Sequence, residues 1–180
     1  MEDYFSGTTA EDFTPEHYRA IGEFVTKYSI LESFFHDVFR LYSAMEPDIS
    51  RAVIGGMRMK DVVERTKRLA KVRALDPRIL KDIEQIETLI DPLSTFRDKV
   101  IHRVWLQSGK GPVVMNLSGA KSVSGITQEP ISTDDLNQKI REVTQVCLRV
   151  MAHALTDVQW LAIPSEYRNM MHAPWRDISA

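Results

Sequence analysis

The sequence predicts an all-α fold, a bundle of four to five helices with a small β-hairpin or loop insertion ahead of the last long helix. Apolar residues recur at helical spacing along most of the 180 residues, which is the pattern of helices that each bury one face. Proline and N-cap residues stand where several of these stretches begin. Hydrophobic residues make up 43% of the chain, which suits a globular protein with a substantial core.

The first long helix is expected to begin with Thr14 as N-cap and Pro15 in its first turn, and to end before Pro47. Two adjacent apolar rows give this helix a wide buried face. A short helical turn over residues 49–54 then ends at a glycine pair, which suits a turn. The next helix is expected over about residues 58–74.

Asp76-Pro77 is expected to open the following helix. Pro92 interrupts its apolar row and predicts either a kink or the start of a separate helix. The row comprises Ile79, Ile83, Ile86, Ile90, Leu93, Val100 and Val104.

After that row the pattern changes. Residues 104–107 and 113–117 flank a turn-rich segment and are expected to pair as a short hairpin. Residues 118–131 are rich in Ser, Gly and Thr and predict a mobile loop. Residues 132–135 begin the last long helix, whose apolar row continues to Leu161.

The expected organisation is a flexible leader at residues 1–13, a helical domain at 14–163 and a C-terminal tail at 164–180. Tyr167 and Trp175 in the tail are expected to dock either back on the bundle or on a partner.

Composition narrows the possible classes. The net charge of −2 gives no global basic field that would point to nucleic acid. A single cysteine, Cys147, excludes an internal disulfide framework and fits a reducing, cytoplasmic setting. Residues 1–13 lack a signal-peptide pattern, and no apolar run approaches the ~20 residues of a membrane span. Histidine and cysteine show no metal-ligand spacing, so no metal site or cofactor is predicted.

Positive charge concentrates in residues 51–81, which carry +7 although the whole chain carries −2. Such asymmetry makes a phosphate-attracting face on a near-neutral protein, and a solvated helix exterior is the alternative interpretation. No aromatic residue interleaves with these cations, so base stacking is not expected there. The candidate RNA-binding residues are Arg58, Lys60, Arg65, Lys67, Arg68 and Lys71.

One segment brings a cation and a proton-transfer group together at fixed spacing. Arg97 is followed directly by Asp98, and His102 comes five positions after the arginine. The guanidinium of arginine is permanently charged and its planar fork suits phosphate. Histidine exchanges a proton near neutral pH. Together these groups are a minimal set for cleaving a phosphodiester without a metal.

This segment resembles the Arg-x4-His motif of the HEPN superfamily, in which the residue after the arginine is usually Asn, Asp or His; here it is Asp98. The resemblance covers roughly residues 15–162, and the motif stands late in a long helix. It implies a helical bundle, typically dimeric, whose Arg and His line a cleft shared by two protomers. Many HEPN domains are metal-independent RNases, whereas others bind RNA, act as antitoxins or serve as scaffolds.

The resemblance therefore implies a metal-independent endoribonuclease, in a toxin or defence role, acting as a homodimer. His102 would take the 2′-hydroxyl proton of RNA, and Arg97 would stabilise charge on the attacked phosphate, which leaves a cyclic phosphate and a 5′-hydroxyl. Asp98 would orient the imidazole or raise its pKa. The alternative is a non-catalytic HEPN-like module that binds RNA or a protein partner, such as an antitoxin; a purely structural oligomer is a third class.

One residue departs from a HEPN subfamily. In toxins paired with nucleotidyltransferase antitoxins, a tyrosine two places after the histidine receives AMP. Val104 stands at that position, so control by this modification is not expected here.

Arg97 and His102 do not share a helix face, because residues five apart point about 140° away from one another on an ideal helix. Asp98 and His102 do share one, being four apart. Three arrangements bring Arg97 to the histidine. The arginine curls around the helix, a local bulge rotates the helix end, or a second copy of the helix supplies the missing half across a dimer interface.

A further acid is expected to act on the motif from the first helix. Glu32 fills a gap in an apolar row of that helix, just as Arg97 fills a gap in the row of the motif helix. An unpaired buried charge is costly. The two are therefore expected either to pair, with Glu32 positioning Arg97, or to lie at the edges of their rows and reach water.

Overall fold

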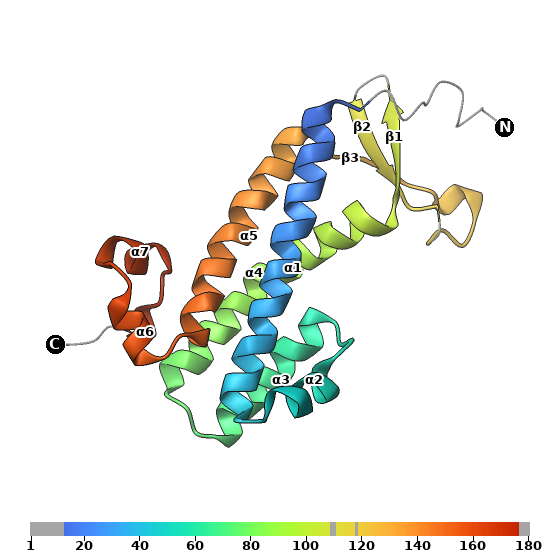
Figure 1. The fold of residues 1–180 in the computed structure, drawn as a ribbon. Helices are drawn as coiled ribbons and strands as arrows, with labels where there is room; N and C mark the ends of the chain where they lie inside the picture. The colour runs from blue at the N-terminus through green and yellow to red at the C-terminus, as the bar shows by residue number, and fades with distance from the viewer. Residues whose placement is uncertain (1–12, 109–110, 118, 177–180) are drawn as a thin grey trace. The chain divides into compact units, whose positions relative to one another are not determined.

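The structure is a computed structural model that describes residues 13–108, 111–117 and 119–176 (Figure 1). The described residues form seven α-helices, two short 3-10 turns and one three-stranded sheet. The elements in chain order are α1 (Pro15–Ser43), α2 (Pro47–Ile54), α3 (Met59–Val72), α4 (Pro77–His102), β1 (Val104–Ser108), β2 (Gly111–Met115), η2 (Val123–Gly125), β3 (Gln128–Pro130), α5 (Thr133–Ala154), α6 (Asp157–Ala162), α7 (Ser165–Met170) and η3 (Pro174–Arg176). The expectation of a mostly helical chain is confirmed.

The chain divides into two compact units, and the long helices α1, α4 and α5 each run through both. Unit 1 consists of the described parts of Met1–Thr26 and Leu93–Arg141, and unit 2 of Lys27–Pro92 and the described part of Glu142–Ala180. The division within α4 falls immediately after Pro92. Because α4 continues through this proline, the alternative of a separate helix starting there is wrong.

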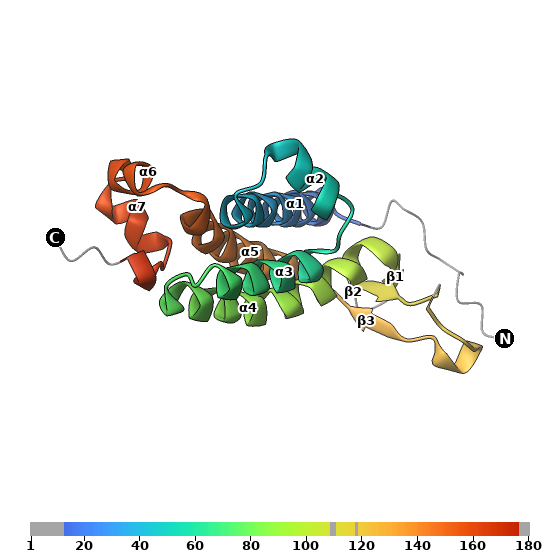
Figure 2. The same ribbon diagram turned by 90° about the horizontal axis from the view of Figure 1, so that it is seen from below.

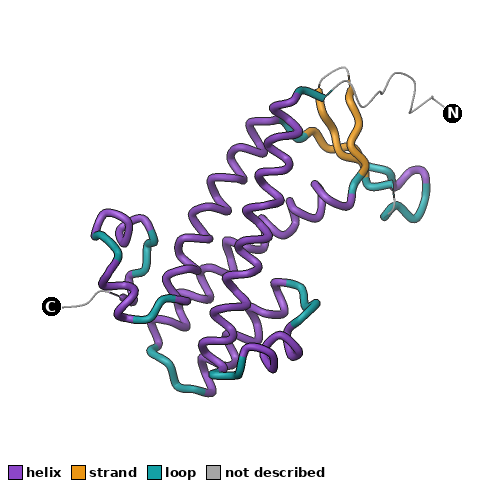
Figure 3. The backbone as a smooth tube through the Cα atoms, viewed as in Figure 1, coloured by secondary structure: helices purple, strands orange, loops and turns teal. Residues whose placement is uncertain are grey.

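Unit 1 contains the small sheet, which is drawn as strands in Figure 3. Strand β2 lies in the centre and pairs antiparallel with β1 on one side and β3 on the other. Alternation along the strands buries Leu106, Val113 and Met115 as one apolar cluster. The helical part of this unit packs through aromatic contacts, with the rings of Phe24 and Phe96 edge to face at 5.1 Å.

Unit 2 contains α2, α3, the first part of α4 and the C-terminal elements. Helix α3 lies beside α4 (Figure 2), and Lys67 Nζ on α3 donates to Glu87 Oε2 on α4 at 2.6 Å. Helices α6 and α7 follow the end of α5 (Figure 2). Trp160 and Met171 bury their side chains in one cluster with Ala152. Of the two tail residues expected to dock, Trp175 packs back on its own chain by stacking on His153, whereas Tyr167 is 57% exposed and does not.

Local capping explains where several helices begin. Thr14 Oγ1 accepts from the backbone N–H of His17 at 3.2 Å, which confirms Thr14 as an N-cap. Asp76 Oδ1 accepts from the backbone N–H of Arg78 at 2.8 Å and opens α4 in the same way. Ser132 and Asp135 exchange bonds between side chains and backbone at the start of α5, which is the arrangement of a capping box.

Three expectations about element boundaries are wrong. Residues 128–130 do not form a loop. They form strand β3, because their backbone pairs antiparallel with that of β2. Val104 belongs to β1 rather than to the helical row. The last long helix ends at Ala154, since Thr156 and Gln159 form a capping box that starts α6 separately. With α6 and α7 formed, seven α-helices replace the four to five expected. Of the leader expected at 1–13, residues 1–12 lie outside the described part.

Candidate functional site

The structure brings the Arg-x4-His motif together within one chain. His102 is the last residue of α4, and the Arg97 side chain curls around the helix until its Nη1 lies 3.2 Å from His102 Nε2. The same Nη1 lies 3.2 Å from Asp98 Oδ1. Of the three arrangements considered from sequence, the curled arginine is the one that the structure contains.

Hydrogen-bond chemistry gives the direction of the contact between Arg97 and His102. A guanidinium can only donate, so Nε2 of His102 is the acceptor in this contact. Asp98 Oδ1 lies 4.0 Å from the same ring nitrogen. Side-chain exposure is 63% for His102, 64% for Asp98 and 29% for Arg97, so a ligand can reach all three.

The helix end that carries these residues is tied to the sheet. Glu129 on β3 accepts from Lys99 Nζ at 2.5 Å and from Arg103 Nη1 at 3.2 Å. Trp105 Nε1 donates to the backbone oxygen of Val100 at 2.9 Å, across the helix-to-strand junction. These three contacts lie on either side of His102 in the sequence and fix where α4 stops and β1 begins.

Glu32 is half-buried on α1, but it belongs to unit 2, whereas Arg97 belongs to unit 1. Pairing of the two therefore stays a prediction.

The candidate RNA-binding cations lie on α3 and at its N-cap, Arg58. Arg58, Lys60, Arg65 and Lys71 are exposed. Lys67 is engaged by Glu87 at 2.6 Å and Glu64 at 3.2 Å, with 18% of its side chain exposed. Arg68 pairs with Glu64 at 3.1 Å. Two of the six cations thus already have carboxylate partners.

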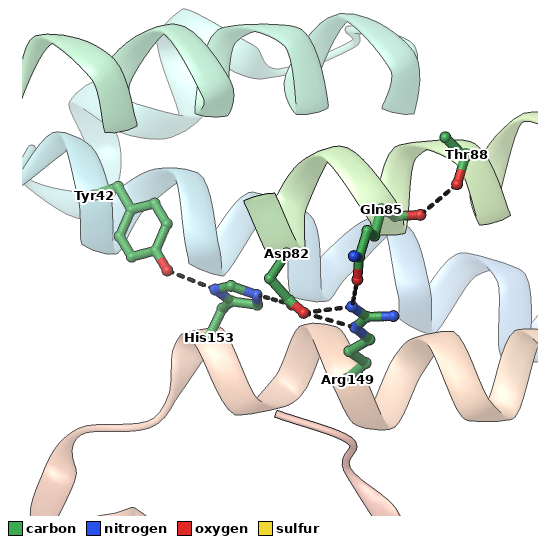
Figure 4. Close-up of polar contacts among 6 residues, drawn as sticks. All are labelled: Tyr42, Asp82, Gln85, Thr88, Arg149 and His153. Atoms are coloured by element: carbon green, nitrogen blue, oxygen red, sulfur yellow. Dashed lines mark hydrogen bonds and ion pairs between the residues drawn. The ribbon is translucent and has the colours of Figure 1, made fainter. Parts of the chain in front are cut away.

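A second polar cluster, the Asp82 network, lies in the core of unit 2 (Figure 4). Tyr42 Oη lies 2.6 Å from His153 Nδ1, and His153 Nε2 lies 2.8 Å from Asp82 Oδ2. Arg149 donates to Asp82 Oδ1 through Nε at 3.0 Å and also through Nη2. Arg149 Nη2 donates in turn to Gln85 Oε1 at 2.5 Å. The network joins α1, α4 and α5.

The charge state of the network follows from burial and these bonds. Burial alone would raise the pKa of Asp82, but donation from His153 and Arg149 outweighs it, and the pKa lies below its ordinary value. Burial lowers the pKa of His153 despite the neighbouring carboxylate. The ring is therefore neutral, with Nε2–H donating to Asp82 and Nδ1 accepting from the Tyr42 hydroxyl.

The Asp82 network stabilises the fold and offers no activated nucleophile. Burial raises the pKa of Tyr42, so its hydroxyl is not an activated nucleophile. Asp82 and His153 are each only 2% exposed. Burial also raises the pKa of Cys147 to about 11, which makes it a structural thiol, as the sequence indicated.

Sequence reasoning missed this network, although a signal was present. Asp82 stands four positions before the buried Ile86, and His153 stands three after the buried Val150. Both are polar residues at core spacing, the same kind of misfit that drew attention to Glu32 and Arg97. Their partnership was not visible, because 71 residues separate them.

No known protein family, curated protein sequence or solved structure matches the chain. No helix in the described part is long and apolar enough to cross a membrane. Within the same ranges, no three His, Cys, Asp or Glu side chains are grouped so that they could hold a metal ion.

Proposed function

We propose that this protein is a metal-independent endoribonuclease whose site is formed by Arg97, Asp98 and His102. The observation that supports this proposal most is the 3.2 Å approach of Arg97 Nη1 to His102 Nε2 at an exposed helix end. A permanent cation and an imidazole side by side are the two groups that metal-free cleavage of RNA requires.

The reaction starts when the phosphate of the RNA backbone binds. The phosphate attracts the Arg97 guanidinium away from the ring, because an oxyanion is a stronger acceptor than a neutral nitrogen. His102 Nε2 is then open and takes the proton of the 2′-hydroxyl. The 2′-oxygen attacks the adjacent phosphorus, and the 5′-oxygen leaves with a proton from an imidazolium or from water. The products are a 2′,3′-cyclic phosphate and a 5′-hydroxyl.

Asp98 acts on both partners. Its carboxylate lies 3.2 Å from Arg97 Nη1 and 4.0 Å from His102 Nε2. It therefore holds the Arg97 guanidinium beside the ring that takes the proton. The exposed cations of α3 offer additional contacts to the RNA backbone.

A non-catalytic module that binds RNA or a protein partner is the second candidate function. It is favoured by the occupied state of His102 Nε2, which accepts from Arg97 and so has no lone pair to offer as a base. In that case Arg97 serves as a contact residue, and the imidazole holds it in place. A homodimer with a toxin or defence role belongs to the proposal through the HEPN resemblance alone, and a cytoplasmic setting through the single cysteine.

Cleavage of mixed cellular RNA in EDTA by the purified protein tests the proposal. We expect cyclic-phosphate products from the wild type and none from His102→Ala or Arg97→Ala. The matched controls are His36→Ala on α1 and Arg141→Ala on α5, where the arginine donates to Gln138 of the same helix at 2.6 Å. Folded wild-type protein that binds RNA without cutting it would favour the binding module. Cleavage that persists in both motif variants would refute the site.

A further inference from the structure

Unit 2 has a pocket outside the Arg-x4-His motif, and its two cations, Arg78 and Lys81, come from the end of the basic segment 51–81. It has a volume of about 210 Å³ and is lined by Arg78, Lys81, Asp82, Gln85 and Trp175. Four of these residues lie in the first three turns of α4, and Trp175 comes from the docked C-terminal segment. The volume is below the roughly 300–1,000 Å³ of sites for drug-sized ligands, so the pocket suits a small group.

The lining acid does not present negative charge to a ligand. Asp82 is 2% exposed, and each of its carboxylate oxygens accepts from within the network, Oδ2 from His153 and Oδ1 from Arg149. Gln85 Oε1 is likewise taken by Arg149 at 2.5 Å. The acceptors that line the pocket are therefore satisfied by the protein itself.

Two of the side chains that line the pocket, Lys81 and Gln85, keep donors that no acceptor among the described residues takes. The exposed Lys81 ammonium has no acidic partner among the described residues. The Gln85 amide keeps its N–H groups, because its bond to Arg149 uses only the oxygen. Arg78 is already paired with Asp76, to which its Nη2 donates at 2.7 Å, so its charge is balanced by this acid. The lining therefore offers hydrogen-bond donors but, among its described side chains, no unused acceptors, so it favours a ligand whose polar atoms accept hydrogen bonds.

Trp175 limits what else the ligand can contain. Its ring stacks on His153 with centroids 4.4 Å apart, and the Arg176 guanidinium lies 4.7 Å from its centroid. These two contacts already use the ring for packing, so a nucleobase gains no stacking platform there. The ligand is therefore defined by its anionic group rather than by an aromatic part.

We propose that this pocket binds a phosphate group, held by Lys81 and the Gln85 amide, with the Asp76-paired Arg78 also in the lining. A phosphate offers several acceptor oxygens and up to two negative charges to these donors. The group can be a free phosphate, a small phosphate ester or the terminal phosphate of an RNA strand. The proposal does not depend on cleavage at Arg97 and His102, which belong to the other unit.

Titration of ¹⁵N-labelled protein with inorganic phosphate, against chloride at equal ionic strength and pH, tests the binding. The reporter is the indole N–H resonance of Trp175, assigned by its loss in Trp175→Phe. We expect a saturable shift in the wild type and affinity about 10- to 100-fold weaker in Lys81→Gln, since a hydrogen bond to a charged group is lost. Lys81→Arg keeps the charge and should retain most of the affinity. Lys121→Ala removes the same charge in unit 1 and should change nothing.

Absence of a saturable shift, or equal affinity in Lys81→Gln, would overturn the proposal. Lys81 is exposed, so its variants should fold, and a circular dichroism melt without phosphate checks this. Two RNAs of one sequence, with and without a 5′-phosphate, then identify the source in a His102→Ala background that prevents cleavage. Tighter binding of the phosphorylated strand that needs Lys81 assigns an RNA end, and equal binding assigns the free anion or a small ester.

Discussion

Replacing Asp82 by asparagine should destabilise the protein by about 3 kcal/mol, because it removes the negative charge from a buried ion pair. Asparagine has the same shape and can still accept one bond. Arg149, however, has only 16% of its side chain exposed, so water cannot replace the lost charge. Breaking a buried pair from one side costs about 3–5 kcal/mol, and the remaining Gln85 contact places this case at the lower end.

Urea denaturation followed by circular dichroism and tryptophan fluorescence measures the change. The slope of free energy with urea should stay constant, so that the midpoint reports stability. The matched control is Asp61→Asn, an exposed acid on α3, which should change the free energy of unfolding by less than about 0.5 kcal/mol.

A double variant separates the ion pair from other effects. Asp82→Asn combined with Arg149→Met removes both charges, so its cost should be smaller than the sum of the two single costs. A loss below about 1 kcal/mol for Asp82→Asn is what an exposed pair would give and would refute the buried network. Strict additivity in the double variant would refute the coupling.

Two further predictions concern the buried side chains of Tyr42, His153 and His17. Tyr42→Phe leaves His153 Nδ1 without its donor and should cost about 1–3 kcal/mol in urea denaturation, whereas Tyr167→Phe at an exposed site should be neutral. Burial lowers the pKa of His153 and of His17 in the folded chain. Below about pH 6.5 these two imidazoles therefore bind more protons in the unfolded chain than in the folded one. The free energy of unfolding should therefore fall as the pH drops below about 6.5, by at most about 1.4 kcal/mol per pH unit for each histidine. His153→Gln should flatten this dependence, and an unchanged slope would contradict it; the lowered pKa of Asp82 adds its own loss of stability only below about pH 4.

Local sequence signals predicted most of the helices and the hairpin. Thr14, Asp76 and the Ser132–Asp135 segment cap the helices they were expected to cap, because an N-cap bond joins residues two or three apart. The pairing of β1 with β2 follows from the turn between them. Strand β3 was missed, since three residues gain strand structure only by pairing with β2, and composition alone does not reveal a distant partner.

For the candidate site too, one part could be predicted from the sequence and another part depends on the three-dimensional structure. Spacing and residue type identified Arg97, Asp98 and His102, yet an ideal helix separates the first and last by about 140°. Only the observed conformation of the long arginine side chain at the helix end brings Nη1 to Nε2. The sequence determined which groups are available, and their side-chain conformations decided which atoms meet.

Sequence alone determined the helical character, the starts of α1, α4 and α5, and the presence of an arginine, an acid and a histidine in one segment, because each depends on neighbours within a few residues. Tertiary structure decided that Asp82 meets His153 across 71 positions, that Trp175 stacks on that histidine, and that a pocket with open donors lies beside them. Such partnerships arise when burial forces distant polar groups to satisfy one another, and nothing in the local pattern specifies which partner each will find.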